Sequence, residues 1–251
     1  SHYALPGWLQ QPACRQVMEY TALRCGRPHA AFACANAFKA DTQADAFVPY
    51  VAASATSLIK AKYYPAAETC VRTAILEARR DGNTVALCDL TGTLAESLAK
   101  AGKKEEALRE VTAALTANQD PKFHGKLLVL RLRYLYEVGK FGEVLEQVAQ
   151  NRDDKNCDAV LPQLLYLGWA AARRLESGNV DTAAFWQQTF LERFPDHILG
   201  ADMYFAAAME HLAAGDYQHA SQQLAFIETR FPGATITNKA RDIRKRLEAV
   251  R

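Results

Sequence analysis

The side chains best suited to chemistry gather in a short segment towards the C-terminal end. Glu210, His211, Asp216 and His219 place two imidazoles and two carboxylates close together in the sequence. In the zinc motif H-E-x-x-H, two histidines stand one helical turn apart so that both reach one ion. That spacing is absent here, and His211 falls at an apolar position of its predicted helix, which is typical of a hydrogen-bonded core histidine. The sequence therefore predicts no metal site and no catalytic site.

The cysteines are the second candidates for chemistry. They are Cys14, Cys25, Cys34, Cys70, Cys88 and Cys157. No two form a C-x-x-C pair, and no spacing matches a zinc site. The even count permits three disulfides, but a chain of this length can bury a core without them. A cysteine nucleophile also needs a base that the fold brings close, which sequence alone does not exclude. We interpret all six as small apolar residues at tight helix contacts.

No glycine-rich phosphate-binding motif is present, so no cofactor is predicted. The 251 residues carry a formal net charge of +2, which is too balanced to favour a nucleic-acid partner. No stretch approaches the roughly 18 apolar residues of a membrane-spanning helix. Apolar residues recur at helical spacing, without the alternation and hairpin turns of strands. These patterns predict an all-α protein.

The clearest pattern lies between Leu199 and Gly233. Two apolar stripes with helical spacing flank Gly215-Asp216, one around Tyr204 to Leu212 and one at Ala220, Leu224 and Ile227. Glycine at such a point supplies the positive φ that ends a helix. The segment therefore predicts two amphipathic helices joined by a tight turn.

This unit resembles the tetratricopeptide repeat, a helix–turn–helix element of about 34 residues. Turn glycines recur along the chain: Gly102, Gly139, Gly178 and Gly215 are spaced by 37, 39 and 37 positions, and Gly26 precedes Gly102 by 76, or two units of 38. The resemblance implies a right-handed α-solenoid of about six helical hairpins with a C-terminal capping helix.

The hairpins are expected within one continuous domain over residues 12–251, after an irregular lead-in at 1–11. The expected units lie near 12–45, 48–81, 88–121, 125–158, 164–197 and 201–234, with the cap at 237–251. The second unit lacks a glycine at its turn, where Lys62-Tyr63-Tyr64 stand.

In this family the first helices of the hairpins line a concave groove that binds extended peptides or partner helices. Carried over by position, the resemblance implies a groove formed by Tyr20, Arg24, Lys60, Lys100, Lys126, Arg133, Tyr136, Leu165, Leu175, Phe205, Met209 and Leu212. Its N-terminal part is mostly polar and basic and its C-terminal part is apolar, which would suit a peptide with acidic residues beside a hydrophobic anchor. Alternatively, the capping helix covers the apolar end. None of these positions is the asparagine of repeats that clamp chaperone C-termini.

The expected function is a non-catalytic scaffold that binds a protein or peptide. The closing motifs Arg193-Phe194-Pro195-Asp196 and Arg230-Phe231-Pro232-Gly233 resemble repeats of bacterial periplasmic and outer-membrane-associated proteins. They favour a role in assembling a cell-envelope complex, in the periplasm or envelope rather than the cytoplasm. Two alternatives stay open: an accessory domain of a larger enzyme or regulator, and an enzyme that binds a small ligand or metal in the groove. The oligomeric state is also open.

Overall fold

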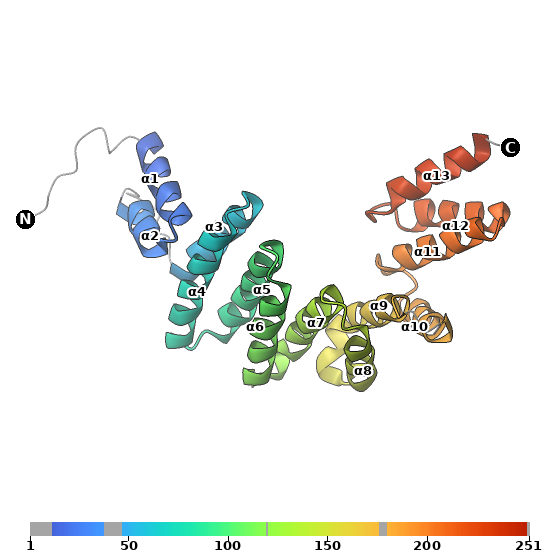
Figure 1. The fold of residues 1–251 in the computed structure, drawn as a ribbon, viewed down its shortest axis with the longest axis horizontal. Coiled ribbons are helices and arrows are strands. Elements are labelled where there is room, and N and C mark those ends of the chain that lie inside the picture. Colours follow the sequence, from blue (N-terminus) through green and yellow to red (C-terminus); the bar gives the residue numbers. More distant parts are fainter. Residues whose placement is uncertain (1–11, 38–46, 119, 176–179, 250–251) are drawn as a thin grey trace, which may run out of the picture. The chain divides into compact units, whose positions relative to one another are not determined.

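The computed structural model describes residues 12–37, 47–118, 120–175 and 180–249 (Figure 1). Within these residues the protein is all-α, with thirteen α-helices, one 3-10 helix and no strand. The expected all-α helical repeat is therefore confirmed. The α-helices are α1 (Pro12–Arg24), α2 (Pro28–Ala37), α3 (Phe47–Lys60), α4 (Tyr64–Arg80), α5 (Thr84–Lys100), α6 (Lys104–Ala117), α7 (Pro121–Glu137), α8 (Phe141–Asn151), α9 (Leu161–Ala172), α10 (Val180–Arg193), α11 (Gly200–Ala213), α12 (Tyr217–Arg230) and α13 (Thr237–Ala249), with the 3-10 helix η2 (Lys155–Val160) before α9.

The chain divides into two compact units, Ser1–Gly139 and Lys140–Arg251. In the first unit, the hairpins α1–α2, α3–α4 and α5–α6 follow one another, and α7 packs on α6. In the second unit, α8 packs on α9, the hairpins α9–α10 and α11–α12 follow, and α13 packs on α12. The single continuous domain expected from the sequence stays a prediction.

The tight turns within the hairpins follow the turn glycines. Gly26, Gly102 and Gly215 at these turns, and Gly139 after the end of α7, all have positive φ, between 66° and 84°. The turn between α3 and α4 has the same backbone conformation without glycine, because Lys62 adopts a φ of 65°. The amide of Tyr63 donates to the carbonyl of Leu58 at 2.9 Å, closing the end of α3 as in the glycine turns. Gly178 lies outside the described residues.

Two helices begin four residues earlier than the units expected from the sequence. α5 starts at Thr84 and α7 at Pro121, four residues before the expected starts at 88 and 125. Local capping explains both starts. The side chain of Asn83 accepts the amide of Ala86, and that of Asp120 accepts the amide of Lys122 ahead of a proline suited to the first turn.

The last helix, α13, covers the apolar end of the second unit. A buried cluster lies beneath it, formed by Ala201, Ala208, Leu224, Ile227, Phe231 and Ala240. Glu228 of α12 binds two guanidinium groups of α13: its carboxylate lies 2.7 Å from Nε of Arg244 and 3.2 Å from Nε of Arg241. The hydrogen bonds from Arg244 hold the pKa of Glu228 below its usual value. An ion-pair clamp thus supplements apolar packing of the cap.

Replacing Lys62 with glycine should stabilise the protein. A side chain with a Cβ is strained at this φ, whereas glycine is not, so we expect the free energy of unfolding to rise by about 1 kcal/mol. Urea unfolding would measure the change. Gly102→Ala is the matched control: its added Cβ meets nothing within 4 Å, so the expected loss of about 1 kcal/mol reports the φ of 84° alone. A loss of stability in Lys62→Gly would contradict the strain.

Glu228→Gln should loosen the cap in a pH-dependent way. Because the folded-state pKa is lowered, the carboxylate stabilises the fold fully above its unfolded pKa of about 4.3, and the benefit disappears as pH falls through the folded value. The side chain is 13% exposed, so we expect a loss of about 1 kcal/mol at pH 7. Urea unfolding at pH 7 and pH 3 would measure the difference in the free energy of unfolding between the wild type and Glu228→Gln. This difference should be smaller at pH 3. An equal difference at both pH values would exclude the ion-pair clamp.

Candidate functional site

The predicted groove residues of the first unit lie on its first helices. Tyr20 and Arg24 belong to α1, Lys60 to α3 and Lys100 to α5, and α7 carries the rest: Lys126, Arg133 and Tyr136. These four helices pack side by side in the order α1, α3, α5, α7. All seven side chains are exposed except Tyr136, which is partly buried. The structure therefore brings this part of the prediction together on neighbouring helices.

The expected basic character of this surface is largely neutralised. Nζ of Lys100 lies 2.8 Å from the carboxylate of Glu96, and Nε of Arg133 lies 3.3 Å from that of Glu137. Lys126 pairs with Asp89 of the preceding first helix. Exposed pairs of this kind add little stability. The ion pairs nevertheless neutralise the excess positive charge that would attract an acidic peptide.

One positive corner remains at the N-terminal end of this surface. The guanidinium of Arg24 lies 4.1 Å from the ring centroid of Tyr63, and the ring of Tyr20 meets that of Tyr63 edge-on at 6.4 Å. Across the part of the chain that the structure describes, neither Arg24 nor Lys60 has a carboxylate within ion-pair distance. Cation–π contact orients Arg24 without neutralising it.

The predicted apolar end of the groove is mostly used for packing. Leu165 is 0% exposed, so its assignment to a binding surface is wrong: it belongs to the core. Phe205 and Met209 pack against the buried cluster beneath α13, and Nζ of Lys239 lies 5.2 Å above the Phe205 ring. Leu175 follows the end of α9. Like Leu212, it is partly exposed. The alternative expectation, a cap over the apolar end, accounts for Phe205 and Met209.

A larger recess, which the sequence analysis did not identify, lies between the second helices α4 and α6 of the first unit. We call it the α4–α6 cleft; its volume is about 960 Å³. Its lining residues are Arg72, Ile75, Leu76 and Arg79 of α4, Thr84, Leu87, Cys88, Thr91 and Leu94 of α5, Glu110, Ala113, Ala114 and Ala117 of α6, Asn118 and Asp120 of the following turn, and Pro121 and Leu127 of α7. Most of this lining is apolar, and α5 forms its floor.

The cleft exists because large residues on α4 meet small residues on α6. Arg72 and Glu110 stand 38 positions apart and bond directly. At the same offset, Ile75 corresponds to Ala113, Leu76 to Ala114 and Arg79 to Ala117. Three alanines cannot fill the space beside α4, so Leu76 stays 65% exposed. Leu76 thereby extends the apolar lining of the recess, and a contiguous apolar surface of this kind is typical of a contact site.

An ion network closes one end of the cleft. The guanidinium of Arg72 bonds Glu68 at 3.1 Å, Glu106 at 3.1 Å and Glu110 at 2.8 Å, and Lys103 also reaches Glu68 at 3.1 Å. Partial burial alone would raise the pKa of Glu68, but the hydrogen bonds from Lys103 and Arg72 lower it below its usual value. Arg72 therefore links α4 to α6 by ion pairs, and its positive charge is matched by these carboxylates.

The opposite end of the cleft carries Arg79, and we call it the open end because no ion pair among the described residues closes it. Arg79 is exposed in the last turn of α4, and no carboxylate among the described residues pairs with it. Asp120 also lines this end, but its carboxylate accepts the amide of Lys122 at the start of α7. The two ends thus differ: one cation is neutralised and the other is available.

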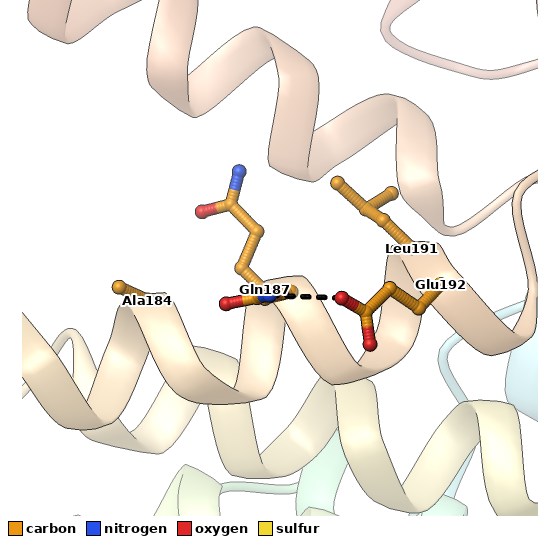
Figure 2. A pocket seen from close by; sticks show the side chains of 5 residues that line it. Ala184, Gln187, Leu191 and Glu192 are labelled. Carbon is orange, nitrogen blue, oxygen red and sulfur yellow. Dashed lines mark hydrogen bonds between the residues drawn. The ribbon is translucent and has the colours of Figure 1, made fainter.

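A second depression lies on α10 in the other unit (Figure 2). Its volume is about 540 Å³, and its lining residues, Ala184, Gln187, Gln188, Leu191 and Glu192, all belong to one helix. Figure 2 shows Gln187 and Leu191 projecting from the same side of α10, and Gln188 donates to Glu192 at 2.8 Å. A single helix does not enclose a ligand, so the α4–α6 cleft is the stronger candidate site.

The histidine cluster is a local arrangement at the turn between α11 and α12. Nδ1 of His219 lies 2.7 Å and Nδ1 of His211 lies 3.3 Å from the same carboxylate oxygen of Asp216. The backbone amide of His219 is the main cause that lowers the pKa of Asp216, and the two imidazoles add to it. Asp216 caps α12 through this amide. The cluster therefore has a structural role in the hairpin turn.

The chain was compared with protein families, curated proteins and solved structures. No family model matches the chain, and no curated protein sequence matches it. Among solved structures, it is similar to the TPR2AB-domain:pHSP90 complex of yeast Sti1, with 11% identity and a TM-score of 0.36 over 97% of this chain and 100% of that one. At this TM-score the likeness transfers no site. Among the described helices, none is long and apolar enough to cross a membrane.

The cysteines should differ sharply in reactivity. All six are free; Cys70, Cys88 and Cys157 are buried, whereas Cys25 is exposed, so the interpretation of all six as tight helix contacts is wrong for Cys25. Burial raises the pKa of Cys70 to about 11 and also raises those of Cys88 and Cys157, which lowers their thiolate fraction.

We expect maleimide at pH 7.5 to label Cys25 at least about tenfold faster than the three buried thiols, as peptide mapping would measure. Guanidinium-unfolded protein is the control and should label at all six positions. Rapid labelling of Cys70 in the folded protein would contradict its burial.

Proposed function

We propose that this chain is a non-catalytic scaffold that binds a segment of a partner protein in the α4–α6 cleft. The observation that carries the proposal is an apolar recess of about 960 Å³ with Leu76 exposed at its wall. A recess of this size lies at the upper end of the range for ligand sites, and its open side admits a segment of a larger molecule. Cys88 lines the recess, but its raised pKa disfavours a thiolate nucleophile there.

The surface formed by the first helices α1, α3, α5 and α7, which we call the first-helix surface, is the second candidate. Its support is the corner formed by Tyr20, Arg24 and Lys60, where exposed aromatic and cationic groups could orient a partner. The pairing of Lys100, Lys126 and Arg133 weakens this candidate, since those cations already have carboxylate partners. The cleft offers apolar area as well as charge, so it is preferred.

The finer proposal is a role in assembling a bacterial cell-envelope complex. Its support is the repeated closing motif, because Phe194 follows α10 and Phe231 follows α12 in the same relative place. An accessory domain of a larger enzyme or regulator is the alternative. Fractionation of the native cells, with antibody detection of the intact protein, separates the two: an envelope location supports the first, and a larger cytoplasmic polypeptide supports the second.

The cleft can be tested with a random peptide library displayed on phage. We expect selected peptides to bind the wild-type protein and to lose at least about tenfold in affinity with Ala113→Trp, whose indole would fill the recess. Ala113 is exposed, so the change should leave the core intact. Ala53→Trp is the matched control, because Ala53 is exposed on α3 among the first helices.

The outcomes of this selection separate the candidates. Loss with Ala53→Trp and retention with Ala113→Trp would move the site to the first-helix surface. Failure to select any binding peptide would contradict the scaffold proposal. Circular dichroism of both variants, expected to match the wild type, shows that neither substitution acts by unfolding the protein.

A further inference from the structure

We propose that the α4–α6 cleft receives an amphipathic helix of the partner, and that an acidic side chain of this helix binds Arg79. This inference rests on the proposed function, because it names the chemistry of the segment that occupies the same cleft. Three observations carry it: the mainly helical lining of the cleft, the alanines of α6, and the difference in ion pairing between Arg72 and Arg79.

The lining favours a helical rather than an extended segment. The walls and floor of the cleft are mostly the sides of α4, α5, α6 and α7, where backbone groups in the helix interiors are bonded within their own helices. An extended peptide would find no strand edge there and would bury unpaired amides and carbonyls, which is costly. A helix satisfies its own backbone groups and presents only side chains to the cleft.

The shape of the cleft also suits a helix. Ala113, Ala114 and Ala117 form a low wall on α6, opposite the larger Ile75 and Leu76 on α4. Small residues let a neighbouring helix approach closely, at the lower end of the usual 8–10 Å between helix axes. An apolar ridge on the partner would then pack against the alanines and cover Leu76.

The length of the cleft limits the contact to about two helical turns. Arg72 closes one end and Arg79 marks the other, and residues seven apart on a helix are separated by about 10 Å. Two turns of an amphipathic helix present apolar anchors at i, i+3 or i+4, and i+7. We therefore expect three or four apolar anchors in the partner segment.

Charge determines which side chain belongs at the open end. Arg72 is paired with three carboxylates, so its positive charge is already matched within the protein. Arg79 lines the cleft and pairs with no carboxylate in the described ranges, and Asp120, which also lines it, uses one carboxylate oxygen to cap α7 through the amide of Lys122. Arg79 is therefore a cation of the cleft without a carboxylate partner among the described residues, and a carboxylate of the partner is its complement.

Synthetic peptides test the inference directly. The probe is a fluorescein-labelled amphipathic peptide of about 14 residues, with leucines at i, i+3, i+4 and i+7 and a glutamate, glutamine or lysine after the last leucine. Affinities are measured by fluorescence anisotropy. For the wild-type protein we expect the glutamate peptide to bind about three- to tenfold more tightly than the lysine peptide, with glutamine between them.

Arg79→Glu should reverse this preference and Arg79→Lys should keep it. Arg80→Glu is the matched control: Arg80 makes the same charge change in the same last turn of α4, but it pairs with Asp81 and does not line the cleft. The order of affinities should therefore stay unchanged in Arg80→Glu. Ala113→Trp should weaken all three peptides.

Each contrary outcome addresses one part of the inference. Equal affinities that are all lost in Ala113→Trp would overturn the acidic anchor and leave the cleft as a binding site. A peptide with a central proline that binds as tightly as its parent would overturn the helical form. If none of the peptides binds while phage-selected peptides bind and lose affinity in Ala113→Trp, the inference fails and the proposed function stands. If neither class binds, both fail.

Discussion

The structure depends on one constraint: a helical hairpin cannot bury its apolar faces alone, so each hairpin needs a neighbour. α5 shows this most clearly, because it packs on α4 and α6 and also reaches α3 and α7. Leu94 and Leu98 are consequently buried at the centre of the first unit. At the other end of the chain α13 provides the neighbour for α12, where Phe205 and Met209 would otherwise be more exposed. A helix surface that no neighbouring helix covers in this stacking is available to bind a partner.

The α4–α6 cleft is a place where stacking is incomplete. At the offset that joins Arg72 to Glu110, a matched ion pair holds the second helices together. One to two turns further on, Ile75, Leu76 and Arg79 correspond to alanines. Apolar surface of the cleft therefore stays in contact with water in the folded protein. A partner helix would bury it. The same mismatch leaves Leu76 exposed and Arg79 without a carboxylate.

Sequence reasoning recovered the elements better than the surfaces. Turn glycines gave the hairpin spacing because a positive φ is a local property of the backbone. Lys62 shows the limit, since another residue can adopt this conformation when packing requires it. The early starts of α5 and α7 were readable from Asn83 and from Asp120-Pro121, but a fixed repeat length concealed them. Burial of Leu165 depends on what packs around α9, which the repeat position alone does not reveal.

The spacing of polar residues along the repeat also indicates which surface residues pair with the next repeat. Asp89 and Lys126 pair across 37 positions, Tyr166 donates to Asp202 across 36, and Arg72 bonds Glu110 across 38. Polar partners one repeat apart meet because stacking places equivalent positions side by side. A charge with an opposite charge one period away is therefore used for stacking, as with Lys126. Arg79 has Ala117 at the 38-residue offset, and it pairs with no carboxylate among the described residues.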